Sequence, residues 1–234
     1  EVLKNMLARI DHRGYPAYKE LQGMYDFGAY MLSIDHVQGD PFAAPSKVHI
    51  EVPGQKAGFP KEYYDTEDKR TAVQDFVLRL FAGEVQNYSF QAKGSGKSGL
   101  LSVSRCGQEI LSRSACQMDN HTGSVTVRLE IGFPAHGRTI DAKALEKILF
   151  GYLPECAKKA LYFSAVPAKE LQKAVHLAED TASLRRQLKE KNLAAFVADG
   201  AVLPRQSGVS DRPMRDAFPF QSPKSLRVEM HLPY

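Results

Sequence analysis

The stretch that most constrains the fold is residues 93–104, KGSGKSGLLSVS, because a phosphate-binding P-loop at this point would require a helix to follow it. The stretch contains Gly96-Lys97-Ser98, which is how a P-loop ends. A P-loop also has a glycine five positions before its Gly-Lys pair, where this chain has Gln91. Residues 100–105 favour a short strand over a helix whose N-terminus would face the phosphates. The sequence therefore predicts a glycine-rich basic loop that leads into a strand, and not a Walker A motif.

The same loop can still bind a phosphate group. Between residues 93 and 99 it has three glycines, two serines, two lysines and no acidic residue, so backbone N–H groups and two ammonium groups are available to an anion. The candidate phosphate-binding residues here are Lys93, Gly94, Ser95, Gly96, Lys97 and Ser98. A plain mobile turn explains the composition equally well. A self-contained NTPase is a third possibility, with Lys97 on phosphate and Asp35 or Asp40 on Mg²⁺.

Composition and charge are those of an ordinary soluble globular protein. Of the 234 residues, 43% are hydrophobic and 25% are charged, and no apolar run reaches the ~18 residues of a membrane span. Residues 101–234 carry 19 basic and 14 acidic side chains, a mild basic bias that suits an anionic partner. The chain begins with Glu1, so we expect a fragment or a processed form.

The cysteines and histidines argue against disulfides and metals. Cys106, Cys116 and Cys156 are widely spaced and form no CxxC motif, which favours a reducing compartment. The seven histidines never fall at metal-ligand spacing. The sequence therefore predicts no metal site.

The first hundred residues contain the patterns of two helices and a small sheet. Apolar spacing predicts a short helix over Val2–Ile10, and alternation predicts strands over residues 30–37 and 48–52, with a possible strand at 24–27 before them. A long helix begins at Asp65 as N-cap and ends at Gly83 as C-cap. Residues 84–99 then form a linker.

Later residues continue the same mixture. Residues 115–118 and 125–131 predict a hairpin. Helices are predicted to begin at Asp141, Pro154 and Pro167, and a new helix cap is predicted at Asp180 or Thr181. Residues 194–198 predict a short buried strand and residues 226–232 a final strand. The fold class is α+β, with mixed or antiparallel sheets, flanking helices and long glycine- and proline-rich loops. We expect two lobes, 1–90 and 100–234.

Several basic residues are candidates for contacts with nucleic acid. Arg185 and Arg186 either lie on the solvated face of a helix or contact nucleic acid. Arg13, beside Gly14-Tyr15, lies in a turn that could contact RNA. Residues 199–213 form a long glycine- and proline-punctuated segment, which favours a functional loop. This segment offers Arg205, Ser207 and Arg212 as anion-binding groups.

Four loops, in order along the chain, resemble the N-terminal region of the predicted ABC-class ATPase family. They are residues 35–46 (DHVQGDPFAAPS), 94–99 (GSGKSG), 199–213 (DGAVLPRQSGVSDRP) and 219–223 (PFQSP). The resemblance covers essentially the whole chain, so residues 1–234 are expected to form the N-terminal domain. In that family the chain continues into an ABC domain with its own P-loop, and this sequence stops just before that point.

The resemblance implies a set of functional expectations. The family includes bacterial proteins and a trypanosomal mitochondrial protein associated with RNA editing, which is thought to dimerise through its ABC domains and to bind RNA in a basic opening. The implied partners are RNA, the adjoining ABC domain and a second copy, with no membrane, in a soluble intracellular protein of mitochondrion or cytoplasm. ATP and Mg²⁺ would be bound mainly by the ABC domain. No Walker A, signature motif or Walker B is found here, so we predict no catalytic residue in this chain.

Two main hypotheses follow for the chain itself. In the first it is a binding module, with RNA contacts from Arg13, Lys97, Arg185, Arg186 and Arg205, or with its basic loops on the nucleotide of the ABC domain. In the second it is a scaffold for that domain, and Asp35, Asp40 and Asp211 only fix loops. Direct RNA titration of the chain distinguishes the two.

Overall fold

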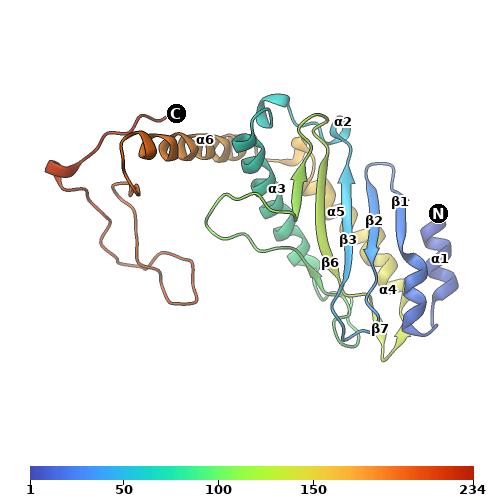
Figure 1. Cartoon of the computed structure of the whole chain (residues 1–234). Coiled ribbons are helices and arrows are strands. Elements are labelled where there is room, and N and C mark those ends of the chain that lie inside the picture. The colour runs from blue at the N-terminus through green and yellow to red at the C-terminus, as the bar shows by residue number, and fades with distance from the viewer.

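Antiparallel pairing organises the centre of the molecule. In the computed structural model, which describes residues 1–234, six strands form one sheet with the order β1-β2-β3-β6 and with β4 and β5 sharing the outer edge of β6 (Figure 1). The strands are β1 (Gly23–Asp26), β2 (Met31–His36), β3 (Ser46–Val52), β4 (Leu101–Ser102), β5 (Cys116–Met118) and β6 (Val125–Ile131). The predicted strand pairs of the first sheet and the hairpin of β5 and β6 are confirmed.

One face of the sheet is apolar and the other is polar. Along β3 and β6, Val48, Ile50, Val127 and Leu129 are buried, while the residues between them are more exposed. Ile50 lies opposite Val127 in register, so the apolar side chains of neighbouring strands meet on one face. This period-two alternation is the physical reason why these residues form a half-buried antiparallel sheet.

Helices cover the apolar face. The helices α3 (Glu67–Tyr88), α4 (Ala142–Lys147) and α5 (Leu153–Ala160) lie behind the sheet, and α1 (Val2–Ile10) packs on α4 beside β1 (Figure 1). A π-helical turn, Ile148–Tyr152, joins α4 to α5. The remaining elements are α2 (Gly54–Ala57), four short 3₁₀ turns (Tyr15–Leu21, Lys61–Tyr63, Phe163–Ala165, Lys224–Leu226) and the small β7–β8 sheet. The α+β fold class is confirmed.

The boundaries of α3 differ from the prediction at both ends. Thr66, not Asp65, is the N-cap, and its side chain accepts a hydrogen bond from the Lys69 N–H at 3.3 Å. The helix continues past Gly83 to Tyr88, because Val85 on the next turn is buried in the core while Gly83 faces open space. Part of the predicted linker over residues 84–99 is therefore helical.

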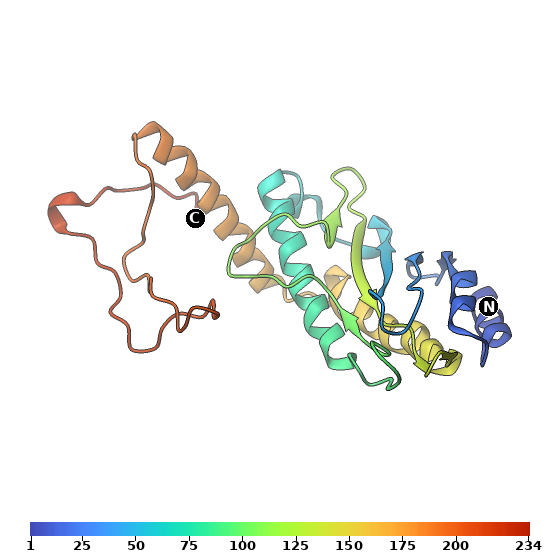
Figure 2. The same cartoon turned by 60° about the horizontal axis from the view of Figure 1, so that its bottom comes forward.

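The last helix, α6 (Ala168–Glu190), is continuous, so the predicted cap at Asp180 or Thr181 is wrong. The Thr181 hydroxyl donates to the Leu177 carbonyl at 2.7 Å, and a threonine bonded one turn back stays inside a helix. Leu171 and Val175 are buried where α6 packs on α3. The second half of α6 leads away from the sheet (Figures 1 and 2).

Residues 191–234 form an extended coil beyond α6, drawn from orange to red in Figure 2. The strands predicted at residues 194–198 and 226–232 are absent, because no sheet edge lies beside either segment, and the strand predicted at 100–105 shrinks to Leu101–Ser102. Many large apolar side chains in this coil are exposed, including Phe196, Leu203, Val209 and Phe218. No helix of the molecule has both the length and the apolar content required to cross a membrane.

The body of the molecule has one core. Strands from before and after residues 84–99 pair in one sheet, and a cluster of 47 buried residues runs from Leu3 to Val175. The loop between β4 and β5 is tied to α3 by the buried Asp75, which pairs with Arg79 and Arg113. Arg79 also donates to the Gly107 carbonyl at 2.7 Å. This ion cluster closes the outer edge of the sheet.

Candidate functional site

Three loops meet at one end of the sheet, where β2 and β6 end and β4 begins. They are residues 38–42, 93–99 and 132–141, the last containing the strands β7 (Ala135–His136) and β8 (Thr139–Ile140). Residues 11–15 join them, because Gly14 bridges to Thr139. We call these four segments the basic loop cluster. It lies at the lower end of the sheet in Figure 1.

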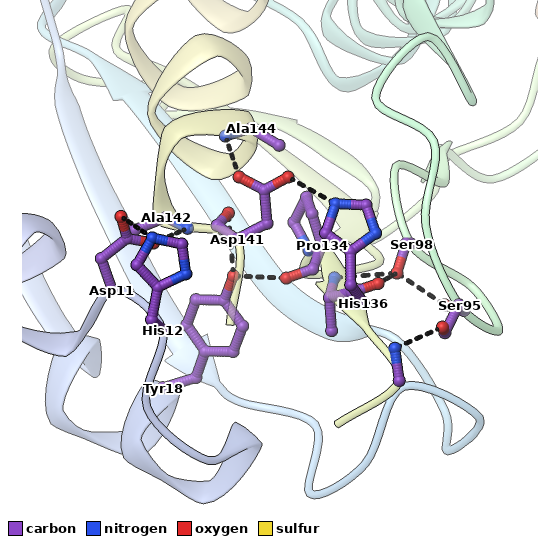
Figure 3. Close-up of polar contacts among 12 residues, drawn as sticks. Asp11, His12, Tyr18, Ser95, Ser98, Pro134, His136, Asp141, Ala142 and Ala144 are labelled. Atoms are coloured by element: carbon purple, nitrogen blue, oxygen red, sulfur yellow. Dashed lines mark hydrogen bonds and ion pairs between the residues drawn. The ribbon is translucent and has the colours of Figure 1, made fainter. Parts of the chain in front are cut away.

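Buried hydrogen bonds hold the glycine-rich loop in place (Figure 3). Ser98 is only 2% exposed, and its hydroxyl donates to the Ser95 carbonyl at 2.5 Å and accepts from the Ala135 N–H at 3.0 Å. The Ser95 hydroxyl accepts from the Gly137 N–H at 2.7 Å. Both serines of the sequence KGSGKSG therefore connect this loop to residues 132–141.

Glycines allow the loops to approach closely. A Cβ atom on Gly132 would lie 1.7 Å from the Lys97 carbonyl oxygen, and one on Gly96, whose φ is 58°, would lie 2.4 Å from the Pro41 carbonyl oxygen. No larger residue fits at either position without displacing backbone. The Lys97 N–H donates to the Pro41 carbonyl at 2.8 Å, and this hydrogen bond holds residues 93–99 against residues 38–42.

This geometry does not fit a P-loop. The backbone N–H groups of Ser95, Lys97, Ser98 and Gly99 each donate to a carbonyl oxygen of the protein, so they are not free to surround a phosphate as P-loop amides do. β4, and not a helix, follows the loop. The reading as a Walker A motif therefore finds no support in the backbone.

The two aspartates considered for Mg²⁺ already have partners. Asp35 accepts from the Ser33 hydroxyl at 2.8 Å and contacts His49 Nδ1 at 2.7 Å. Asp40 accepts from the Phe42 N–H at 2.9 Å and from Arg138 Nε at 2.9 Å. Hydrogen bonding from Phe42, and then from Arg138, holds the pKa of Asp40 below its usual value. No cluster of three His, Cys, Asp or Glu side chains suited to a metal ion occurs in the molecule.

The basic loop cluster carries four basic side chains, Arg13, Lys93, Lys97 and Arg138, together with the carboxylates of Asp11, Asp40 and Asp141. Lys93 and Lys97 make no ion pair, and the side chain of Arg138 is 78% exposed although it pairs with Asp40. Arg13 pairs with Glu20 at 2.9 Å. The Ile140 N–H donates to the Arg13 carbonyl at 2.9 Å, and this contact holds Arg13 beside residues 132–141. The structure thus brings Arg13, Lys93 and Lys97 to one end of the molecule.

Arg138 is the member of this group that sequence reasoning missed. It follows Gly137, whose φ of 59° forms the β7–β8 turn. A glycine–arginine pair in a tight turn was the available signal, but the sequence does not show that this turn lies beside the glycine-rich loop.

Two buried tyrosines, Tyr15 and Tyr18, pack beneath the loops of the basic loop cluster, and Figure 3 shows the contacts of Tyr18. The Tyr18 hydroxyl donates to the Pro134 carbonyl at 2.6 Å, and burial raises the pKa of Tyr18 and of Tyr15 far above the ordinary value. Asp141 caps α4 through the Ala144 N–H at 2.9 Å, and its other carboxylate oxygen lies 3.3 Å from His136 Nε2. These contacts make the loops a rigid platform.

The remaining candidate residues lie elsewhere. Arg205, Ser207 and Arg212 share a hairpin-like loop in the coil, in which the Gln206 N–H donates to the Arg212 carbonyl at 2.8 Å. Neither arginine of this loop makes an ion pair, and no hydrogen bond engages the Asp211 side chain. Arg185 and Arg186 lie on the second half of α6. Figure 1 places the coil and this half of α6 far from the basic loop cluster.

Comparison with known protein families finds two matches. A model described as the N-terminal domain of ATPases of the ABC class matches residues 1–164, and a P-loop domain model matches residues 167–234. No curated protein matches the chain. The first match ends where α6 is about to begin, and the second starts at the N-cap of α6. Since the first model covers well over half of the chain, the chain belongs to the ABC-class ATPase family.

Proposed function

We propose that this chain is the RNA-binding module of an ABC-class ATPase and that the basic loop cluster contacts the phosphates of single-stranded RNA. The observation that carries the proposal is the convergence of Arg13, Lys93, Lys97 and Arg138 on loops locked by buried hydrogen bonds. Cations held on a rigid platform bind a polyanion with little loss of conformational entropy.

The chemistry favours recognition of the backbone over recognition of the bases. Lys93 and Lys97 have no acidic partner to give up, so a phosphate can neutralise them directly. No RNP-like motif accompanies them, so sequence-specific reading of bases is not expected. The exposed Phe42 of the basic loop cluster offers one ring on which any base could stack. We expect affinity for RNA with little preference for sequence.

Family membership supports an ATPase-type protein, because a P-loop domain implies a bound nucleotide. Residues 93–99 do not fit a phosphate cradle, and residues 167–234 contain no Gly-Lys-Ser or Gly-Lys-Thr sequence. We propose that the loop holding Arg205, Ser207 and Arg212 contacts nucleotide phosphates, since its two guanidinium groups are exposed and unpaired. ATP and Mg²⁺ as the ligands, dimerisation through ABC domains, and a mitochondrial or cytoplasmic location rest on the resemblance alone.

RNA binding is tested with a labelled single-stranded oligoribonucleotide and the 234-residue chain. Fluorescence anisotropy at several salt concentrations gives the slope of log K against log[salt]. Each phosphate contact on a single strand contributes roughly −0.7 to that slope. We therefore expect Lys97→Ala to weaken binding several-fold and to reduce the slope by about 0.7, and Lys93→Ala/Lys97→Ala to reduce it by about 1.4.

A charge-matched control separates local contacts from net charge. Lys173→Ala removes one positive charge from α6, where Lys173 is exposed and unpaired, and should leave the affinity nearly unchanged. An equal loss in Lys173→Ala and Lys97→Ala would show that only net charge matters. A folded chain that binds no RNA would favour the scaffold role, in which these loops hold the ABC domain.

A further inference from the structure

Two phenylalanine side chains in the body of the molecule are exposed, and both belong to segments that touch the glycine-rich loop. Phe42 is 65% exposed and Phe90 is 53% exposed. The Lys97 N–H donates to the Pro41 carbonyl at 2.8 Å, and the Phe90 N–H donates to the Gly99 carbonyl at 2.7 Å. Residues 97–99 therefore hold the backbone of both phenylalanines next to the segment that carries Lys93 and Lys97.

Phe42 is held firmly although its ring is open to solvent. The Phe42 N–H donates to Asp40 Oδ1 at 2.9 Å, and the Asp40 carboxylate also accepts from Arg138 Nε at 2.9 Å. A Cβ atom on Gly96 would lie 3.0 Å from Phe42 Cδ1, so one edge of the ring lies against the glycine-rich loop. The ring is thus positioned near Arg138 and Lys97 without being buried in the core.

Phe90 has an unfavourable backbone conformation. Its φ of 61° lies in the left-handed region, which glycine adopts readily and which is an outlier for a bulky side chain. Because about half of the side chain is exposed, packing of the ring offsets little of this cost. Strained residues of this kind cluster at ligand-binding sites, and a half-exposed ring at a position that suits glycine indicates a role outside the core.

Cations and exposed rings together are what proteins use to bind single-stranded nucleic acid. Positive side chains follow the phosphates, and the bases stack on aromatic rings whatever their sequence, since every base has a flat face. In a duplex these faces are already stacked on one another. The loop that carries Lys93 and Lys97, with Phe42 and Phe90 beside it, supplies both kinds of contact.

We propose that Phe42 and Phe90 each stack on one base of a single-stranded RNA whose phosphates bind Lys93 and Lys97. Single strands then gain contacts that a duplex cannot make, and they gain them with little dependence on sequence. This role of the two rings rests on the RNA binding proposed for the basic loop cluster, and it adds the residues that select single strands.

Two labelled oligoribonucleotides of equal length, one with bases and one abasic, test the stacking by fluorescence anisotropy with the 234-residue chain. The abasic strand presents the same phosphates without base faces. We expect Phe42→Leu and Phe90→Leu each to weaken binding of the strand with bases about fivefold, as for the loss of one stacked base, and to leave binding of the abasic strand unchanged. Phe42→Tyr keeps the ring and should bind as wild type does.

Controls separate stacking from general effects of the substitutions. Phe218→Leu removes a 95% exposed ring from the coil and should change the binding of neither strand. A duplex of the same sequence offers phosphates but no free base face, so neither Phe42→Leu nor Phe90→Leu should weaken its binding. Thermal unfolding of each variant shows whether it is folded.

The outcomes distinguish stacking from phosphate binding. If wild type binds both strands equally, or if both leucine variants bind the strand with bases as wild type does, the stacking proposal is overturned. A loss in one leucine variant alone assigns stacking to that ring and overturns it for the other. Lys97→Ala should weaken binding of the abasic strand in any case, so phosphate contacts can stand where stacking fails. If a folded chain binds neither strand, the proposed function fails and stacking fails with it.

Discussion

Burial of single side chains sets the chemistry of the three thiols. Cys116 and Cys156 are 1% and 0% exposed, and burial raises the pKa of each to about 12. Cys106 lies half-buried in the loop between β4 and β5, where burial also raises its pKa, but its sulfur is more accessible. Since the thiolate is the reactive form, a raised pKa and poor access both protect the two buried thiols.

We therefore predict that a thiol reagent at pH 8 modifies Cys106 first, and that Cys116 and Cys156 react only when the chain unfolds. Mass spectrometry of the alkylated protein with and without denaturant measures this order. The variant Cys106→Ser should leave no rapidly reacting thiol. Rapid labelling of Cys156 in the native chain would mean that α5 does not pack on the core as described.

At the scale of elements, one crowded glycine and one open glycine allow the loop packing at the basic loop cluster and the course of α3 to be tested. A Cβ atom at Gly132 would collide with the Lys97 carbonyl, whereas at Gly83, inside α3, it would meet nothing within 4 Å. We predict that Gly132→Ala lowers the free energy of unfolding by about 1–3 kcal/mol, because overpacked backbone must move, and that it also weakens RNA binding by displacing residues 93–99. Denaturant unfolding and anisotropy measure the two effects.

Gly83→Ala is the matched control. In a helix interior alanine is favoured over glycine by up to about 1 kcal/mol, so this variant should be as stable as wild type or more stable. If Gly83 ended the helix in a left-handed conformation, the same change would destabilise the chain. If Gly83→Ala is stabilised and Gly132→Ala has the same free energy of unfolding as wild type, the close approach of Gly132 to the Lys97 carbonyl is contradicted.

At the scale of the whole molecule, a packed body is followed by an exposed coil. Core residues run from Leu3 to Val175, and residues 191–234 are exposed almost throughout. Exposed irregular chain is where proteases cut first. We predict that brief trypsin digestion of the 234-residue chain cuts after Lys191, Arg205 and Arg212 and leaves a resistant fragment of roughly 190 residues.

Mass spectrometry of the fragments identifies the order of cleavage, and basic residues within the body supply the internal control. Arg70 and Lys158, on α3 and α5, should be cut only after the coil is lost. Early cleavage at either position would mean that the helices do not cover the sheet. The resistant fragment keeps Lys97 and lacks Arg205. If it still binds RNA, Arg205 is not required for that binding.

Local patterns predicted much of the body and little of the last forty residues. Alternation in residues 48–52 and 125–131 is a direct consequence of one buried sheet face, so β3 and β6 appear where expected. The same alternation in residues 226–232 predicts a strand that does not form, because a strand needs a hydrogen-bonding neighbour and none lies beside this segment. The predicted helix ends were the least reliable. Thr66 and not Asp65 caps α3, α3 continues past Gly83, and α6 continues past Thr181.

Residues close together in the chain were sufficient to predict the α+β class, the hairpin of β5 and β6, the basic glycine-rich loop and the resemblance to the ABC-class ATPase family. The folded structure was needed to show that Arg138 lies on the same loop cluster as Lys93 and Lys97, and that Ser98 is buried and bonded to the Ala135 N–H. Hydrogen bonds in the body join residues as much as 133 positions apart, such as Tyr162 and Ala29. Such contacts arise from packing of the whole core, and no local pattern encodes them.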